Sequence, residues 1–147
     1  MIDFTKNQNK LKNFTENNRT FSLRNPSQKY FGYVKGETTA EAPGQKRCDY
    51  IICFNFGSEN NRPSNYLFIE LKGSDNKKAL EQVVSTIQYF LNNGLTKNNC
   101  VNCFIVSGSC PSVTTRDQIL KAKFPYGKHP YNFTLTFKTR HAEYEIK

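Results

Sequence analysis

Residues 65–73, NYLFIELKG, decide the fold, because apolar side chains alternate along them with a period of two. In a strand the aliphatic side chains of this stretch share one face: Leu67, Ile69 and Leu71. The opposite face carries aromatic rings and then two charges: Tyr66, Phe68, Glu70 and Lys72. We expect a helix to cover the aliphatic face. A carboxylate among apolar neighbours is costly without a partner, and an ion pair of Glu70 with Lys72 is the plainest explanation for it.

A second acid, Asp49, interrupts the apolar run of residues 48–56, CDYIICFNF. If this strand neighbours residues 65–72 in an antiparallel meander, it carries Asp49 up to Glu70. Two converging carboxylates repel each other unless a cation or a proton lies between them. Mg²⁺ favours one or two carboxylates completed by waters and phosphate oxygens, so the pair predicts a Mg²⁺ site, with Mn²⁺ as a substitute. Lys72 would help to orient or deprotonate the attacking water and offset charge in the transition state.

The elements around these strands predict an α/β domain on a mixed sheet. Strands at residues 30–34, 48–56 and 65–72 are joined closely enough for a meander. Apolar residues at offsets of three and four predict a helix over residues 80–91 with Ser74 or Asp75 as its cap. A strand at residues 102–107 follows this helix, as in a parallel crossover.

The two ends of the chain extend this core. Phe4, Leu11 and Phe14 fall on one helical stripe, so residues 1–27 predict a short amphipathic helix, with a frayed arm as the alternative. Another helix is expected at residues 114–123, and strict alternation over residues 131–146 predicts a last strand or hairpin. The expected order is therefore α-β-β-β-α-β-α-β.

The length of 147 residues fits a single domain, divided into an N-terminal helix or arm (1–27), a catalytic core (28–107) and a C-terminal extension (108–147). The 12 Phe and 8 Tyr exclude a wholly disordered chain. No apolar run approaches the ~20 residues that span a bilayer, and the first residues contain no signal-peptide h-region. We therefore expect a cytoplasmic protein with no membrane partner.

Charge and cysteine content narrow the partner and the compartment. Lys and Arg number 21 and Asp and Glu 12, so the net charge is 21 − 12 = +9, which favours a polyanion such as nucleic acid as partner. Five cysteines cannot all pair internally, and a reducing compartment is favoured. Cys100 and Cys103 have the spacing of half a zinc site, but no well-spaced second pair completes it, so a buried Cys103 is the simpler interpretation.

The pattern CDYI (residues 48–51) followed by FIELKG (residues 68–73) resembles the PD-(D/E)xK nuclease superfamily, which includes restriction endonucleases and Holliday-junction resolvases. The resemblance covers residues 30–107 and implies an αβββαβ restriction-endonuclease-like core with Mg²⁺-dependent hydrolysis of phosphodiester bonds. It implies that Asp49 and Glu70 are metal ligands, with the carbonyl of Leu71 as an extra ligand, and that Lys72 is the catalytic lysine. The sequence departs from the pattern at Cys48, where the family often has proline.

The same resemblance suggests further site residues. Some members carry a glutamine on the following helix, which Gln82 matches, and Tyr89 lies two turns later on nearly the same stripe; both are otherwise boundary residues of an amphipathic helix. Many members also use an upstream acid, for which the sequence does not choose among its candidates: Glu16, Glu37 and Glu41. The charges that flank the acidic strands are candidate phosphate contacts: Lys46, Arg47, Lys77 and Lys78.

These features favour a metal-dependent DNA endonuclease, with DNA preferred over RNA as the substrate. One alternative is a catalytically inactive nucleic-acid-binding module of the same fold. Another is an RNase, including a toxin or a phage-defence effector, because the metal chemistry reads the phosphate and not the sugar. A protein-interaction domain is the interpretation if Asp49 and Glu70 lie far apart. Cutting both strands of a duplex would call for a homodimer or a second nick.

Overall fold

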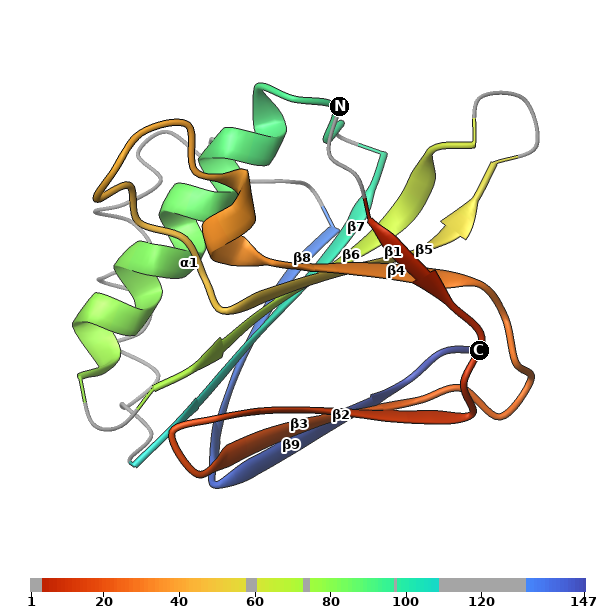
Figure 1. Ribbon diagram of the computed structural model, residues 1–147, viewed down its shortest axis with the longest axis horizontal. Helices are drawn as coiled ribbons and strands as arrows, with labels where there is room; N and C mark the ends of the chain where they lie inside the picture. Colours follow the sequence, from red (N-terminus) through yellow and green to blue (C-terminus); the bar gives the residue numbers. More distant parts are fainter. Residues whose placement is uncertain (1–3, 58–60, 73–74, 97, 109–131) are drawn as a thin grey trace.

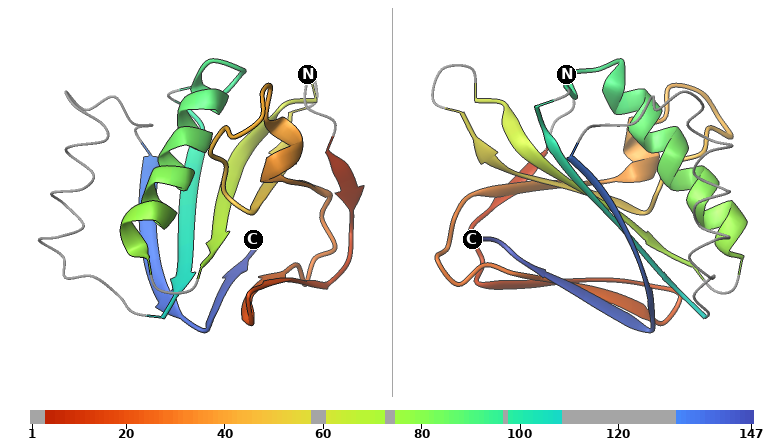
Figure 2. Two further views of the ribbon diagram at one scale, coloured as in Figure 1. Left: turned by 60° about the vertical axis from the view of Figure 1, so that its left-hand side comes forward. Right: turned by 180° about the vertical axis from the view of Figure 1, so that it is seen from behind.

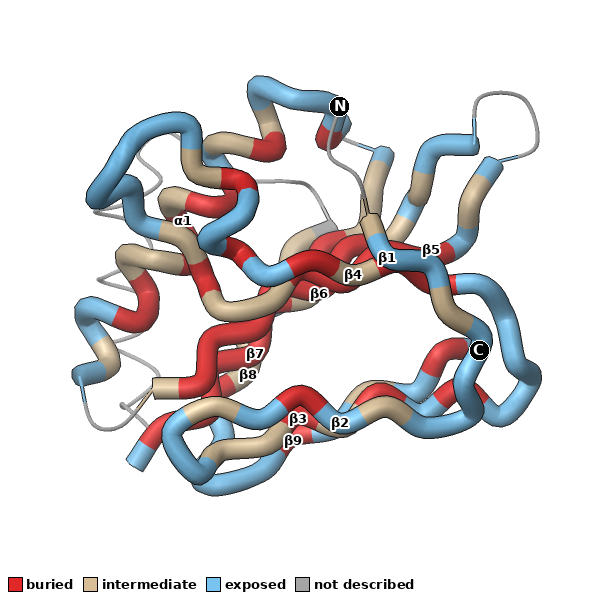
Figure 3. The backbone as a smooth tube through the Cα atoms, viewed as in Figure 1, coloured by how far each residue is buried: buried red, intermediate tan, exposed pale blue. Residues whose placement is uncertain are grey.

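The structure is a computed structural model that describes residues 4–57, 61–72, 75–96, 98–108 and 132–147. It has three layers: the helix α1 (Asn76–Leu91), a six-stranded mixed sheet and a three-stranded mixed sheet (Figure 1). The helix lies on one face of the larger sheet and the smaller sheet faces the other, as two further directions show (Figure 2). Buried residues are concentrated on the central strands between the layers (Figure 3).

The larger sheet has the strand order β1-β4-β5-β6-β7-β8. Its strands are β1 (Thr5–Asn7), β4 (Phe31–Lys35), β5 (Tyr50–Phe56), β6 (Pro63–Leu71), β7 (Cys100–Ser107) and β8 (Asn132–Thr139). Neighbours are antiparallel from β1 to β6, whereas β6–β7 and β7–β8 are parallel. A short 3₁₀ helix, η1 (Gly36–Thr39), follows β4. The expected meander of β4, β5 and β6 and the parallel strand after the helix are confirmed.

The helix α1 begins where the sequence indicates. The carboxylate of Asp75 accepts a hydrogen bond from the backbone N–H of Lys78 at 3.0 Å, which satisfies one of the free donors of the first turn. The apolar stripe of the helix is buried against the sheet, with Leu80, Val83 and Ile87 fully covered. The cap and the stripe were therefore both predictable from local sequence.

The face of the sheet that the helix covers is the opposite of the one expected. The ring of Phe90 in α1 contacts the rings of Tyr66 and Phe68, with centroid distances of 5.7 and 5.4 Å. The aliphatic face of β6 instead packs in the core between the two sheets. The strands β6 and β7 are parallel, and the general preference for right-handed crossovers selects the side of the sheet on which the connecting helix lies. Aromatic and aliphatic faces bury equally well, so alternation alone could not assign the faces.

The N-terminal helix expected within residues 1–27 is wrong, because the described part of this segment forms three strands: β1, β2 (Leu11–Glu16) and β3 (Arg19–Arg24). Asn17 and Asn18 have positive φ values of 51° and 58°, which join β2 and β3 in a tight hairpin turn. Phe14 is buried between the sheets while Leu11 is 55% exposed, so the apparent helical stripe is a coincidence of spacing.

The C-terminal alternation marks two strands rather than a hairpin. β8 pairs in parallel with β7, while β9 (His141–Glu145) pairs in parallel with β3 in the smaller sheet, whose order is β2-β3-β9. Alternation identifies a strand but does not select its partner. The helix expected at residues 114–123 lies outside the described residues. The described order contains the β-β-β-α-β run of the expected core, with strands in place of its leading helix.

Four cysteines in the described part of the chain are free thiols: Cys48, Cys53, Cys100 and Cys103. Cys103 is fully buried in the core beside α1, as expected for a small apolar residue, and Cys110 lies outside the described residues. Among the described helices, none combines the length and apolar character needed to cross a membrane.

Candidate active site

Asp49 and Glu70 lie together at one end of the larger sheet. Tyr50 is the register partner of Ile69 in the antiparallel pair β5–β6, so the preceding residue, Asp49, comes opposite Glu70 and on the same face. The backbone N–H of Asp49 donates to Oε1 of Glu70 at 3.1 Å. In return, the backbone N–H of Leu71 donates to Oδ2 of Asp49 at 2.7 Å. Each acid is therefore held by the backbone of the other acid's strand.

The Glu70 carboxyl group is the most perturbed charge of the site. Its side chain is fully buried, and among the described residues its Oε2 atom has no hydrogen-bond partner. Burial raises the pKa of Glu70 to about 9, helped by the negative charge of Asp49 and a side-chain hydrogen bond with it, and opposed by the charge of Lys72. Without a bound metal ion, this carboxyl group therefore keeps its proton at neutral pH, despite the charge of Lys72.

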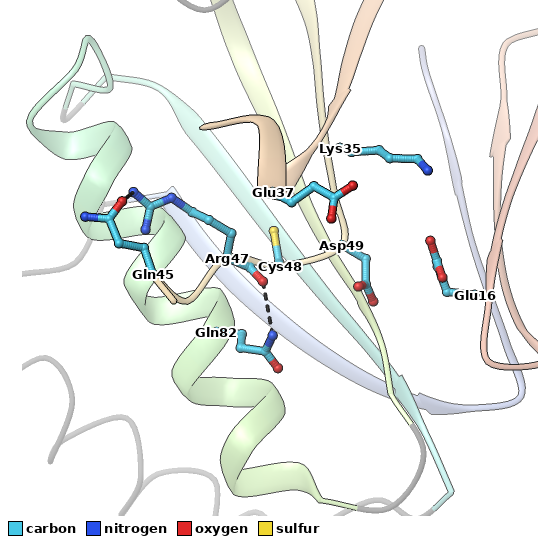
Figure 4. Close-up of a pocket in the computed structure, with 8 residues that line it drawn as sticks. All are labelled: Glu16, Lys35, Glu37, Gln45, Arg47, Cys48, Asp49 and Gln82. Atoms are coloured by element: carbon cyan, nitrogen blue, oxygen red, sulfur yellow. Dashed lines mark hydrogen bonds between the residues drawn. The ribbon is translucent and has the colours of Figure 1, made fainter. Parts of the chain in front are cut away.

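A pocket of about 300 Å³ opens beside Asp49 (Figure 4). Side chains from β2, β4, η1, the loop before β5 and α1 meet there, so that both sheets and the helix contribute. In Figure 4 the carboxylates of Asp49 and Glu16 face each other across the pocket. The lining residues are Glu16, Lys35, Glu37, Gln45, Arg47, Cys48, Asp49 and Gln82.

The structure distinguishes among the three upstream acids. Glu16 lines the pocket from the end of β2 rather than from a helix, and the Tyr50 hydroxyl donates to its Oε1 atom at 3.3 Å. Glu37 lines the same pocket from η1. Glu41 is exposed in the loop that follows and is not part of the lining. Glu16 and Glu37 are therefore the upstream acids near Asp49, and Glu41 is not.

Lys72 and the carbonyl of Leu71 follow Glu70 at the end of β6. Lys72 is half-buried, its backbone N–H donates to the carbonyl of Val106 at 3.0 Å, and its positive charge acts on Glu70. The Leu71 carbonyl accepts a hydrogen bond from Nδ2 of Asn17 at 3.0 Å, which leaves its second lone pair for another partner. The hairpin turn thus contacts the strand that carries the acid.

Gln82 reaches the pocket from α1, as expected. Its Nε2 atom donates to the carbonyl of Arg47 at 3.2 Å, while its Oε1 atom is buried without a hydrogen-bond partner in the described structure. Tyr89 does not line the pocket; its ring instead lies under the guanidinium of Arg47, 4.4 Å from Cζ to the ring centroid. Tyr89 therefore acts on the site through Arg47.

The four basic side chains that are candidate phosphate contacts differ in whether they already have partners within the protein. Lys46 forms an ion pair with Glu81 at 2.8 Å. The guanidinium of Arg47 donates from Nε to Oγ1 of Thr39 at 3.0 Å and from Nη1 to the Lys46 carbonyl at 2.9 Å. Lys77 and Lys78 are exposed in the first turn of α1. The second pair is therefore the more available for binding phosphates.

Sequence reasoning missed two residues that come from other segments of the chain. The pairing of β4 with β5 brings Lys35 into the pocket, and the stacking of the two sheets brings Asn17 to the carbonyl of Leu71. One local signal exists at Gly36: a Cβ atom there would lie 1.6 Å from the carbonyl oxygen of Cys48. A glycine directly after a strand indicates this kind of close approach, but it does not say which strand approaches.

The acids of the site suit a hard divalent ion, although they do not form a complete cage. Within the described residues, no group of three or more His, Cys, Asp and Glu side chains could hold a metal ion. Asp49, Glu70 and the Leu71 carbonyl would supply three oxygen ligands, and Mg²⁺ commonly leaves its other positions to waters and substrate oxygens. The buried Oε2 atom of Glu70, which lacks a donor, is the atom that such an ion would satisfy.

Comparison with known proteins adds no identification. No protein-family model matches the chain, and no curated protein or solved structure matches it. What the chain does must therefore be inferred from the chemistry of this site.

Proposed function

We propose that the chain is a divalent-metal-dependent nuclease that hydrolyses phosphodiester bonds, with DNA as its substrate and internal bonds as its targets. The observation that carries this proposal is the convergence of Asp49 and Glu70, each bonded to the other's strand, with Glu70 fully buried. The net charge of +9 supports a polyanionic substrate. The closeness of the two acids supports this proposal over a protein-interaction domain without chemistry.

The proposed metal would be held by the Asp49 and Glu70 carboxylates and the Leu71 carbonyl. A buried carboxylate oxygen without a hydrogen-bond donor is costly, and a cation between the two acids removes both this cost and their mutual repulsion. When bound, the ion would polarise a phosphoryl oxygen and lower the pKa of a water. Mg²⁺ and Mn²⁺ both suit such oxygen ligands.

The chain's own residues position the reacting groups. The backbone N–H groups of Asp49 and Leu71 fix the orientation of the two carboxylates. Lys72, whose charge already acts on Glu70, supplies positive charge where the phosphoryl oxygens gain negative charge in the transition state. Gln82 presents a buried oxygen that can accept a hydrogen bond from a water in the pocket.

The acids also separate this proposal from a binding module without catalysis. Three carboxylates line the pocket, from Glu16, Glu37 and Asp49, and they repel the phosphates of a nucleic acid. A module that only binds gains nothing from this arrangement, whereas a hydrolase needs acidic oxygen ligands at the scissile bond. The location of the acids therefore favours hydrolysis.

The test is incubation of the purified chain with supercoiled plasmid, linear DNA, branched DNA and RNA, each with Mg²⁺, Mn²⁺ or EDTA. We expect nicked and linear products from plasmid with either ion and none with EDTA. Preferential degradation of RNA would support the proposed hydrolysis of phosphodiester bonds but would identify RNA, and not DNA, as the substrate. The proposal fails if no substrate is cut with either ion, or if cutting continues unchanged in EDTA.

A further inference from the structure

Lys35 is a cation of the pocket to which none of the roles above is assigned. It is the last residue of β4, and its register partner is Tyr50, the residue that follows Asp49. Its side chain lines the pocket, on the far side of Asp49 from α1 (Figure 4). The side chain therefore lies on the strand side of the pocket, whereas Arg47 and Gln82 lie on the helix side.

The backbone around Lys35 is fixed against the segment that carries Asp49. The N–H of Gly36 donates to the carbonyl of Asp49 at 2.9 Å, and a Cβ on Gly36 would lie 1.6 Å from the Cys48 carbonyl oxygen. The hydroxyl of Thr38 donates to the carbonyl of Lys35 at 2.6 Å. The base of the Lys35 side chain is thus held in place, although the long side chain is exposed and adjustable.

The other basic side chain that lines the pocket is already occupied. The Arg47 guanidinium contacts Thr39, the Lys46 carbonyl and Ser85, and one of its faces lies on Tyr89. The Lys35 ammonium, by contrast, forms no hydrogen bond or ion pair with any residue that the structure describes. A phosphate that enters among three pocket carboxylates needs a positive charge beside it, and of the two basic side chains in the described lining, Lys35 is the one with donors to spare.

We propose that Lys35 binds a backbone phosphate next to the scissile one, an inference that rests on the proposed nuclease function. An ammonium is a compact point charge with three donors on a flexible stem, which suits the non-bridging oxygens of a phosphodiester. A contact of this kind positions the substrate without reading its bases. Lys35 therefore contributes to the binding of nucleic acid of any sequence and not to the chemical step.

The experiment compares Lys35→Met, which keeps length and removes charge, with Lys35→Arg and with Lys10→Met as a matched control. Lys10 precedes β2, roughly 20 Å along the strand from Glu16 at ~3.3 Å per residue. Plasmid nicking in Mg²⁺ gives KM and kcat, and fluorescence anisotropy of a labelled duplex in EDTA gives the dependence of affinity on salt.

For Lys35→Met we expect KM to rise roughly five- to tenfold with kcat within about twofold, because one phosphate contact is lost. The slope of log K against log salt should fall in magnitude by about 1, equally for duplexes of different sequence. Lys35→Arg should restore most of the affinity, and Lys10→Met should behave as wild type. These results together would support the assignment.

Two failures are distinguishable. If the wild-type chain cuts DNA but Lys35→Met has the same KM and the same salt slope, the assignment of Lys35 is wrong and the nuclease proposal stands. An equal effect of Lys10→Met, or a loss in kcat alone, also overturns the assignment. If the wild-type chain neither binds nor cuts any nucleic acid, the nuclease proposal fails, and the assignment of Lys35 fails with it.

Discussion

At the residue scale, the site depends most on the Glu70 carboxyl group. It lies fully buried on the face of β6 that carries the aromatic rings and packs against α1. It accepts a hydrogen bond from the backbone N–H of Asp49. Its other oxygen has no partner among the described residues. A buried acid of this kind is stable when protonated or when it faces a cation, and unstable as a bare carboxylate.

The raised pKa of Glu70 makes the stability of the metal-free protein depend on pH. The folded carboxyl group keeps its proton up to a pKa of about 9, against 4.5 as its ordinary value. Between these values the folded state binds more protons than the unfolded state, so the free energy of unfolding should fall as the pH rises from about 5 to 9. Urea unfolding in EDTA across this range measures the effect.

Glu70→Gln is the control, because the amide has nearly the same shape and does not ionise. It should flatten the dependence on pH and raise the melting temperature at pH 8, by about 2–4 °C for each kcal/mol gained. Mg²⁺ should stabilise the wild-type chain at pH 8 and leave Glu70→Gln nearly unchanged. An identical pH profile for the two proteins would show that Glu70 is not the titrating group.

Substitutions at Asp49 and Lys72 should affect different steps: the first should remove metal binding, and the second should remove stabilisation of the transition state. Asp49→Asn removes a metal ligand, so cleavage should disappear while nucleic-acid binding is kept or strengthened, because one repulsive charge is lost. Lys72→Ala should lower kcat roughly 10²–10³-fold and leave Mg²⁺ binding intact. Rates and calorimetric titration with Mg²⁺ measure both effects, with Glu143→Gln on β9 as the control. A fully active Asp49→Asn protein would exclude Asp49 as a ligand.

At the scale of elements, the β2–β3 hairpin connects the smaller sheet to the site. Its turn places Glu16 in the pocket and bonds Asn17 to the carbonyl of Leu71. Positive φ at Asn17 and Asn18 is a conformation that asparagine and glycine tolerate. The hairpin therefore needs residues that tolerate positive φ and a side chain that bonds to Leu71. Two substitutions can separate these two needs.

Asn17→Gly keeps the turn and deletes the hydrogen bond to Leu71, whereas Asn18→Gly keeps both. Loss of one such bond should cost about 1 kcal/mol of unfolding free energy, or about 2–4 °C in melting temperature for a chain of this size. Asn18→Gly should melt near the wild-type temperature. Thermal melts followed by circular dichroism test the difference, and equal melting temperatures for the two variants would show that the Asn17 contact does not stabilise the fold.

The elements differ in how far they could be predicted. The strands β4, β5 and β6, the helix α1 and its Asp75 cap follow from local alternation, spacing and capping, and each is present. The N-terminal helix expectation is wrong because three apolar residues match a helical stripe by chance, and Asn17-Asn18 forms a hairpin turn instead of ending a helix. The pairing of β9 with β3 joins segments over a hundred residues apart, and no local pattern encodes such a partner.

At the scale of the whole molecule, the basic side chains proposed to bind nucleic acid are not equally available. Lys46 and Arg47 are held by Glu81 and by the loop and helix around them, while Lys77 and Lys78 are exposed at the start of the helix that also carries Gln82. Nucleic-acid affinity should therefore depend on the second pair more than on the first.

Replacing Lys77 and Lys78 together by alanine should weaken DNA binding and reduce the salt slope by up to about 2, without changing sequence preference. Lys46→Ala should have a smaller effect, because its ammonium already pairs with Glu81. Anisotropy titrations at several salt concentrations with two unrelated duplexes test this order. A larger effect of Lys46→Ala, or binding that is insensitive to salt, would contradict it.

The site was predictable where it depends on two adjacent strands and a helix, and hidden where it depends on the stacking of layers. Asp49, Glu70 and Gln82 follow from the meander and the helix after it. Lys35 reaches the pocket through close backbone approach, and Asn17 reaches the Leu71 carbonyl through contact between the sheets. Such proximity arises only in the assembled fold, and the periodicity of individual strands does not predict it.

The most direct test of the central claim is the rate of plasmid cleavage by wild type and Glu70→Gln, measured side by side across Mg²⁺ concentrations. The substitution keeps the shape of a fully buried side chain and removes its charge, and the melting curves described above show whether the variant is folded. We predict Mg²⁺-dependent cleavage by the wild type and a loss of at least about 10²-fold in the variant at every Mg²⁺ concentration. A folded Glu70→Gln protein that cuts as fast as wild type would contradict the claim that Asp49 and Glu70 form the catalytic metal site.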